Sequence, residues 1–412
     1  MRLLVKNIGT IVGIETAGRL RLCGGEMDRL ETFDDAWLLA DDGRIAAFGS
    51  MDSLGEMAAD EVVDAGGGML FPSFCDSHTH LVYAGSREQE FLDKINGLTY
   101  EQIARRGGGI LNSADLLHRT SEEELYRQAM GRIREIAAMG RCGGDQERLR
   151  ADYGRRVEDA ARHPAYPRDG AAGRARHVPR GACRAARLRR TAGGVCRPGL
   201  LRNAACGGGR RTGRFRRRVL RRRVRPRGAD GTHHEGRAQA GHARQDPRQR
   251  TRRLGRRAGG RGDVALSVDH LERMGGPEIG ALHGTETSPT MLPGAAFFLG
   301  MSYPPAREMI NAGLGVALAS DYNPGSSPSG NMRMVVSLAC IRMRMTPAEA
   351  INAATLNGAY AMGLSRDYGS VTVGKVANFF LTVPMPSVAF MSYAYTTPLI
   401  SRIFLRGEEV VA

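Results

Sequence analysis

The sequence predicts an α/β protein in which a core of parallel strands and helices carries a small β domain built from both ends of the chain. In the middle of the chain, apolar strands alternate with helical patterns, which is typical of βα units around a parallel sheet. Short strands and turns fill residues 1 to about 70 and return at 369–412, so we expect the two ends to meet. The length of 412 residues suits two or three domains, or one large barrel with an appendage.

Local patterns predict the individual elements. Apolar runs at 36–40 and 44–48 flank an Asp-Asp-Gly turn and predict a β-hairpin. Three glycines at 66–68 break the chain before an apolar strand that begins at Met69.

Helical patterns cover 99–140 and 346–362. The first contains a helix whose start, Thr120-Ser121-Glu122-Glu123-Glu124, offers a cap and an acidic first turn. Its apolar stripe is formed by Leu125, Ala129, Ile133, Ile136 and Ala137. Two apolar strands, 264–268 and 315–319, precede the second helix.

The positive charge is concentrated in one segment. The net charge of the chain is +16, but residues 141–262 hold 36 arginines, no lysine and 9 acidic residues, a net charge of +27, so the other 290 residues carry −11. The segment has no Ile, Met or Trp and only 12 Val, Leu or Phe among 122 residues, too few to offset the entropy of ordering it. Three interpretations of this segment stay open: an arginine-rich binding arm, a disordered linker, or a stretch translated in the wrong frame.

Two histidines at a strand end are the strongest sign of chemistry. Segment 76–80 has the sequence DSHTH, and side chains at i and i+2 of an extended chain point the same way. His78 and His80 can therefore reach one metal ion. An isolated pair of this kind is more often two polar residues at a strand end, but this pair follows an apolar strand, where barrel active sites lie.

Further polar residues follow the later strands. Asp321 comes just after 315–319; alone it is more often a turn residue, but with an upstream histidine pair it becomes the natural carboxylate ligand and proton acceptor. His270 also ends a strand. From its spacing alone, it is equally expected to be a buried structural histidine or a residue of the site. Arg87, by spacing alone, is more often a surface charge than a ligand clamp.

Longer motifs around these residues resemble a known family. The strand end 72–80 and the tail 369–379, of sequence GSVTVGKVANF, resemble the metal-dependent amidohydrolase superfamily. Within it, the chain resembles the imidazolonepropionase family of histidine degradation through the runs HTHLVYAGSR (78–87), GGGI (107–110), SVDHLE (267–272) and DYNPGS (321–326). The resemblance covers residues 1–140 and about 263–412, with Ser73 and Asn378 where Gly and Asp are usual.

The resemblance implies a fold and a reaction. The fold is a (β/α)₈ TIM-like amidohydrolase barrel of residues 71–365, with a small β-sandwich domain formed by residues 1–70 and 366–412. The reaction is hydrolysis of 4-imidazolone-5-propanoate to N-formimidoyl-L-glutamate by a metal-activated water. The cofactor is one Zn²⁺ or Fe ion, because the chain has only three lysines, none at a barrel strand end, to bridge a second ion.

The resemblance also implies a role for each site residue. His78, His80 and Asp321 hold the ion, and Asp321 also moves the proton. His270 stabilises charge at the attacked carbonyl, and Arg87 pairs with the propanoate carboxylate. The ring pocket is lined by Asn323, Gly325 and Ser326.

Three further motifs of the family are missing from the arginine-rich segment, and one frame shift restores them. When the last two bases of each codon are joined to the first base of the next, 143–151 can encode VEIKSGYGL, 177–183 TFLGAHA and 245–251 KIHANEL. All three blocks then appear in the family's order. We therefore predict that residues 141–262 are translated out of frame, between compensating frame changes near 141 and 263.

This shift has a functional cost. The third metal histidine is expected at the position of Pro247, a substrate tyrosine at Leu149 and a substrate histidine at Ala182. The middle of the barrel is disrupted as well, and losing consecutive strands exposes sheet edges. We expect this chain to fold poorly and to have little activity.

The expected partner is a small-molecule substrate in the cytoplasm. No run approaches the ~20 apolar residues of a membrane span, and the arginine-rich segment lacks the interleaved aromatic residues of a single-strand binder. Neither a membrane nor a nucleic acid is expected, and the oligomeric state stays open, with a homodimer as one candidate. The alternatives are another cyclic-amide hydrolase or deaminase of the superfamily, and an inactive scaffold with an arginine-rich nucleic-acid-binding segment.

Overall fold

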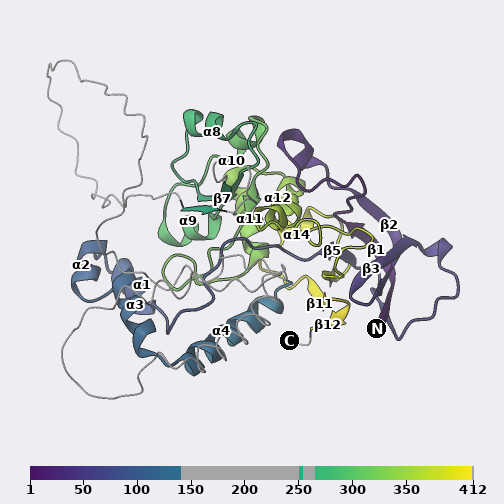
Figure 1. The fold of residues 1–412 in the computed structure, drawn as a ribbon, viewed down its shortest axis with the longest axis horizontal. Helices are drawn as coiled ribbons and strands as arrows, with labels where there is room; N and C mark the ends of the chain where they lie inside the picture. The colour runs from purple at the N-terminus through teal and green to yellow at the C-terminus, as the bar shows by residue number, and fades with distance from the viewer. Residues whose placement is uncertain (141–249, 254–264, 411–412) are drawn as a thin grey trace, which may run out of the picture.

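The computed structural model describes residues 1–140, 250–253 and 265–410 (Figure 1). The strands are β1 (Arg2–Val12), β2 (Thr32–Asp41), β3 (Arg44–Ser50), β4 (Glu61–Asp64), β5 (Met69–Pro72), β6 (Arg250–Arg253), β7 (Ala265–His270), β8 (Ser288–Met291), β9 (Ala317–Leu318), β10 (Phe379–Thr382), β11 (Ile400–Leu405) and β12 (Glu408–Glu409). The helices are α1 (Glu88–Ile95), α2 (Tyr100–Arg105), α3 (Ile110–Arg119), α4 (Glu122–Ala137), α8 (Gly276–Leu282), α9 (Pro293–Leu299), α10 (Ala306–Asn311), α11 (Met332–Met343), α12 (Pro347–Ala354), α13 (Leu356–Ala361) and α14 (Phe390–Tyr393), with short 3₁₀ turns η1 (Gly24–Asp28) and η2 (Met51–Ser53).

Strands from both ends of the chain share one sheet. Their hydrogen-bonded order is β12-β11-β10-β5-β1-β2-β3, with β4 paired to β1. The two ends join where β10 runs antiparallel to β5, with Phe380 opposite Phe71, and Figure 1 shows the yellow strands β11 and β12 on the same side of the molecule as the purple strands β1, β2 and β3. The predicted hairpin is confirmed as the antiparallel pair β2 and β3. The expected domain boundaries and the two-layer sandwich stay predictions.

The second sheet supplies the parallel core. Its order is β6-β7-β8-β9, and β7, β8 and β9 run parallel as the sequence predicts, whereas β6 pairs antiparallel with β7. Because parallel strands end at the same edge, side chains that follow β7 and β9 are brought to one side of the molecule. The predicted strand 315–319 is shorter than expected, since only Ala317 and Leu318 are paired.

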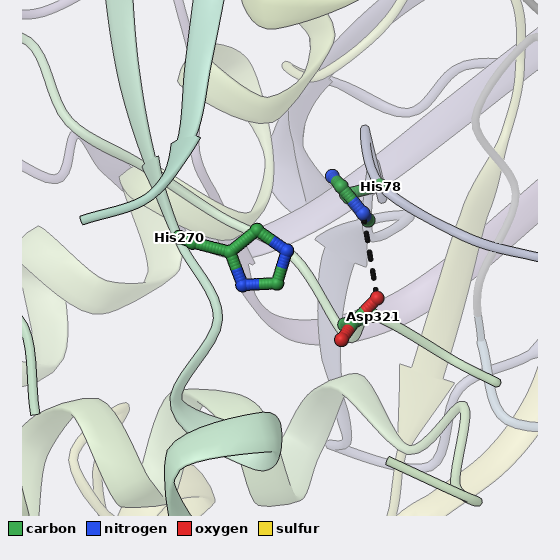
Figure 2. Close-up of side chains that lie close together, drawn as sticks. All are labelled: His78, His270 and Asp321. Atoms are coloured by element: carbon green, nitrogen blue, oxygen red, sulfur yellow. Dashed lines mark ion pairs between the residues drawn. The ribbon is translucent and has the colours of Figure 1, made fainter. Parts of the chain in front are cut away.

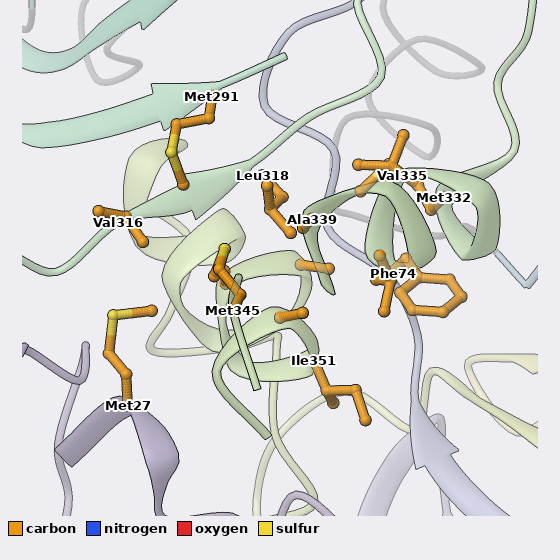
Figure 3. Packing of buried hydrophobic residues seen from close by; sticks show 14 of the residues in the cluster. Met27, Phe74, Met291, Val316, Leu318, Met332, Val335, Ala339, Met345 and Ile351 are labelled. Carbon is orange, nitrogen blue, oxygen red and sulfur yellow. The ribbon is translucent and has the colours of Figure 1, made fainter. Parts of the chain in front are cut away.

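One large apolar cluster ties N-terminal segments to this parallel sheet. Figure 3 shows it between the strands and helices α11 and α12, with Met27 of η1 and Phe74 reaching in from the N-terminal part of the chain. Met291 of β8 and Leu318 of β9 are fully buried in it. Each such side chain contributes about 1.5–3 kcal/mol when removed from water, so the core fixes the strand ends that carry the polar residues.

The predicted helices form, with one correction. Helix α4 begins after Ser121, whose side chain accepts a hydrogen bond from the Glu124 amide, as predicted. The single helix expected at 346–362 is wrong, because α12 ends and α13 begins at Thr355, where φ is −119° and ψ is −90°. The Thr355 hydroxyl donates to the Ile351 carbonyl, a local bond that competes with a continuous helix.

A buried lysine organises the tail motif that carries the resemblance. The Lys375 ammonium donates to the carbonyl oxygens of Ser365 and Tyr368 and to the Ser370 hydroxyl. Burial lowers the pKa of Lys375 to about 8. Its three acceptors make it a structural cation that joins the end of α13 to the β10 strand. None of the described helices is both long and apolar enough to cross a lipid bilayer.

Candidate metal centre

Two chain segments meet at the carboxyl ends of β5 and β9. The His80 amide donates to the Tyr322 carbonyl at 3.0 Å, and the Asp321 amide donates to the His78 carbonyl at 3.0 Å. These bonds pair Thr79 with Tyr322 in parallel register. Asp321 adopts a φ of +53°, an uncommon conformation for a residue other than glycine, so the backbone is shaped to turn its carboxylate toward the histidines.

The predicted ligands converge on one point. The Nε2 atoms of His78 and His80 are 3.3 Å apart, and Asp321 Oδ1 lies 3.3 Å from the first and 3.2 Å from the second. A tetrahedral ion with bonds of about 2.0–2.1 Å holds its ligand atoms about 3.3–3.4 Å apart. The three donor atoms therefore already have the spacing of one face of a zinc or iron coordination sphere, and the residues fit the implied ion.

His270 faces the same centre from β7. Figure 2 shows its ring turned toward His78 and Asp321, which lie on the segments that follow β5 and β9. Ligand atoms of these three residues all lie within 4.8 Å of one another, and the rings of His270 and His78 are 5.3 Å apart, edge to face. His270 has a φ of +82° and its Nδ1 lies 3.6 Å from a carboxylate oxygen of Glu272.

Two buried carboxylates make the centre strongly attractive to a cation. Asp269 and Asp321 are 5% and 2% exposed, and each contacts His78, whose Nδ1 lies 3.1 Å from Asp269 Oδ2. Burial disfavours the charged imidazole, but these carboxylates outweigh it and raise the pKa of His78 to about 10. Burial likewise opposes ionisation of Asp321, but His78 and His80 hold its pKa well below the usual range. A bound cation would supply the positive charge that the protonated imidazole supplies otherwise.

Short hydrogen bonds fix the strand ends that carry the ligands. Asp76, which is buried, accepts hydrogen bonds from the amide of Ser320 at 3.1 Å and from its hydroxyl. This contact joins the residue two positions before His78 to the residue before Asp321. On the other side, the Ser326 hydroxyl donates to Asp321 Oδ2 at 2.7 Å, so Oδ1 is left facing the imidazoles.

The loop after Asp321 is organised by Asn323. Its Oδ1 accepts from the amides of Gly325 and Ser326, and its Nδ2 donates to the Asp321 carbonyl and the Ser326 hydroxyl. These four bonds use the full capacity of the amide side chain. The structure thus gives Asn323 a loop-holding role, and its direct contact with a substrate stays a prediction.

Arg87 reaches this loop but is already paired. Its Nε and Nη2 donate to the two carboxylate oxygens of Glu90, and Glu90 also accepts from the Gly109 amide at 2.7 Å. A Cβ added at Gly325 would lie 2.1 Å from Arg87 Nη1. Arg87 and Gly325 are therefore in close contact, and only the Nη1 side of the guanidinium faces away from Glu90.

Sequence reasoning missed several of these partners. Asp76 and Asp269 stood inside quoted motifs, two residues before His78 and directly before His270, yet were given no role, and Glu90 drew no attention. A carboxylate within two residues of a candidate histidine was the available signal. The three replaced site positions, Leu149, Ala182 and Pro247, lie outside the described residues.

Comparisons with known proteins agree with this geometry. Residues 270–401 match the model of the amidohydrolase family. The chain is 40% identical to the imidazolonepropionase of Flavobacterium johnsoniae, over 99% of each protein. It is also 40% identical to the imidazolonepropionase of Christiangramia forsetii, over 100% of each.

Solved structures share the fold at low identity. A triazine hydrolase variant has a TM-score of 0.57 at 13% identity, over 100% of this chain and 94% of that one. A mutant of atrazine chlorohydrolase TrzN from Arthrobacter aurescens TC1, in complex with zinc and atraton, has a TM-score of 0.52 at 13% identity, over 99% and 95%. The fold class is thus the α/β, TIM-barrel type of the amidohydrolases. Because it is 40% identical to these two imidazolonepropionases over nearly their full length, the chain belongs to the imidazolonepropionase family of amidohydrolases.

Proposed function

We propose that the metal centre of this protein serves the hydrolysis of 4-imidazolone-5-propanoate to N-formimidoyl-L-glutamate in histidine degradation. The enzyme class is a hydrolase of carbon–nitrogen bonds in cyclic amides. The observation that carries the proposal is the triangle of donor atoms from His78, His80 and Asp321, with edges of 3.2–3.3 Å. The nucleic-acid-binding alternative is not favoured, because the full-length relatives are imidazolonepropionases.

One Zn²⁺ or Fe ion is the proposed cofactor, held by His78, His80 and Asp321. When bound, the ion supplies Lewis acidity, which makes water a competent nucleophile near neutral pH. Asp269 supports this by holding Nδ1 of His78 at 3.1 Å, which leaves the Nε2 lone pair directed at the centre. In the restored frame, a third histidine at position 247 completes the set of ligands.

The chain's own residues then guide the bond changes. The water oxygen bonds to the ring carbonyl carbon, and the bond from that carbon to the ring nitrogen breaks. Asp321 accepts the proton of the water at Oδ2, the oxygen that contacts Ser326, and delivers it to the departing nitrogen. His270 donates a hydrogen bond to the carbonyl oxygen as negative charge develops there.

Arg87 is the proposed partner of the propanoate carboxylate. Glu90 occupies the Nε and Nη2 positions, so the substrate meets Nη1 and the remaining N–H of Nη2. This charge-assisted pair would orient the substrate toward the metal centre. Gly325 sits against Nη1, and its lack of a side chain leaves the guanidinium in place; Asn323 and Ser326 shape the same loop.

Substitution of Gly325 tests this arrangement. In a frame-restored chain, whose residues 141–262 are replaced by the peptide of the shifted frame, ring opening yields N-formimidoyl-L-glutamate. Gly325→Ala displaces Arg87 and raises KM about tenfold, the cost of one impaired charged contact, with kcat changed less. Steady-state kinetics and product identification measure both quantities.

The matched control is Gly280→Ala, because nothing lies within 4 Å of an added Cβ there. A KM for Gly325→Ala equal to that of the control contradicts the Arg87 contact. Absence of the product from the unsubstituted frame-restored chain contradicts the proposed function itself.

We further propose the finer architecture and its consequences. Residues 1–70 and 366–412 form a two-layer β-sandwich on a (β/α)₈ barrel of residues 71–365, whose middle is disrupted by the out-of-frame segment. Lacking a histidine at position 247, the chain as it stands is impaired. Its partner is the small-molecule substrate, with neither membrane nor nucleic acid, and a homodimer is a candidate assembly.

A further inference from the structure

Helix α4 carries a row of polar side chains that faces the metal centre. Gln128, Arg132 and Glu135 are spaced at i, i+4 and i+7, so they share one face of the helix. None of the three belongs to a motif of the proposed reaction. Each of them contacts a residue that follows one of the metal ligands.

Arg132 holds the segment that follows His80. Its Nη1 donates to the carbonyl oxygens of Leu81 at 2.9 Å and Tyr83 at 3.0 Å. Its guanidinium carbon lies 3.3 Å from the centre of the Tyr83 ring, and its Nη2 donates to Gln128 Oε1. That same oxygen accepts from the Gly85 amide at 3.2 Å. One arginine therefore fixes the path of the chain from His80 toward Arg87.

Glu135 holds the segment that carries Asp321. Its Oε2 accepts a hydrogen bond from the Tyr322 hydroxyl at 2.8 Å, and Tyr322 is only 5% exposed. The Tyr322 carbonyl in turn accepts from the His80 amide.

Apolar packing reinforces both polar contacts. The described residues include a separate cluster of Leu81, Tyr322 and three α4 side chains, Met130, Ile133 and Ile136, with Tyr126 against it. Leu81 follows His80 and Tyr322 follows Asp321. Helix α4 is therefore attached to both ligand-bearing segments by apolar and polar contacts.

We propose that Arg132 and Glu135 are positioning residues, which hold segments 78–83 and 321–322 in register so that the donor atoms of the metal centre stay together. The inference rests on the proposed metal centre. Its physical basis is that a ligand triangle with 3.2–3.3 Å edges depends on two chain segments, and α4 is bonded to both.

The test measures Zn²⁺ affinity and amide hydrogen exchange on the full chain. Arg132→Met keeps most of the apolar stem but removes the donors, and we expect it to raise the Kd for Zn²⁺ about 10- to 100-fold, as is typical of outer-shell partners. Exchange at the His80 and Asp321 amides should accelerate about tenfold, while the β1–β2 amides keep their protection. Arg132→Lys, which retains a charged donor, should recover part of both effects.

Two further variants sharpen the result. Glu135→Gln keeps an acceptor for Tyr322 and should stay near the unsubstituted chain, whereas Glu135→Ala should weaken Zn²⁺ binding. Arg134→Met is the matched control, because Arg134 lies exposed on the other side of α4. The inference is overturned if Arg132→Met changes neither the Kd for Zn²⁺ nor the exchange of the His80 and Asp321 amides. It is also overturned if the β1 and β2 amides exchange faster to the same extent, because Arg132 then has only a general structural role. If neither the unsubstituted chain nor its frame-restored form binds Zn²⁺, the proposed metal centre fails, while exchange at the two amides still decides the role of α4.

Discussion

Restoring the reading frame of residues 141–262 is expected to raise kcat/KM for ring opening of 4-imidazolone-5-propanoate at least about a thousandfold over the chain as it stands. The restored peptide returns a metal histidine to position 247, a tyrosine to 149 and a histidine to 182. Removal of one such group typically costs about 10²–10³ in rate, and catalytic groups that act together lose most of the effect with the first deletion. Steady-state kinetics on the two purified chains measure the difference.

The restored chain also offers an internal control. Changing only position 247 of the restored chain back to proline should remove most of the gain, because proline has no side-chain atom that can bind a metal. Equal turnover by the restored chain and the chain as it stands would contradict the out-of-frame hypothesis, since the groups at 149, 182 and 247 would then be dispensable.

Asp321→Asn is expected to lower kcat/KM of the frame-restored chain by about a thousandfold or more. Asparagine has nearly the same shape, but it removes the negative charge between His78 and His80 and cannot accept a proton from water. Loss of a positioned proton acceptor alone costs about 10²–10⁴. The pH dependence of kcat/KM and the metal content of the variant should be measured together.

Asp52→Asn is the control for the loss of one acidic group, because Asp52 lies exposed on η2, far along the chain from the centre. It should leave the kinetics unchanged. An Asp321→Asn variant with more than about a tenth of the parental kcat/KM is incompatible with a proton-transferring ligand at this position.

Local sequence patterns predicted the residues of the metal centre because each pattern is short. The i, i+2 spacing of His78 and His80 on an extended chain predicts that both side chains point the same way. The place of Asp321, just after an apolar run, can be read from the same short stretch of sequence. The structure brings these three residues together, and His270 with them. His270 and Asp321 follow β7 and β9, which belong to one parallel sheet and end at a common edge. The histidine pair follows β5 of the other sheet and reaches them through the pairing of Thr79 with Tyr322.

The supporting contacts were beyond such patterns because they join distant segments. Ser320 donates to Asp76 across 244 positions and His78 contacts Asp269 across 191. Nothing in the local sequence of either partner indicates the other. The pairing of Arg87 with Glu90 is local, but an arginine and a glutamate three residues apart are common on helices, so the pattern was not informative.

Helix boundaries were predicted with mixed success for a related reason. The start of α4 follows from a side-chain cap at Ser121, a strong local signal. The break at Thr355 combines the local bond of its hydroxyl to the Ile351 carbonyl with a close tertiary approach, because the Thr355 carbonyl lies 2.8 Å from where a Cβ of Gly369 would be. Tertiary contacts of that kind override helical propensity.

Metal content of the frame-restored chain tests the central claim most directly. We expect about one Zn²⁺ or Fe ion per chain, loss of ring opening when a chelator removes it, and recovery when the ion is returned. Replacement of His78 by alanine should abolish both metal and turnover. A chain that opens the ring at full rate without stoichiometric metal, or whose rate is unchanged by the chelator, contradicts the metal-activated water and the site built on His78, His80 and Asp321.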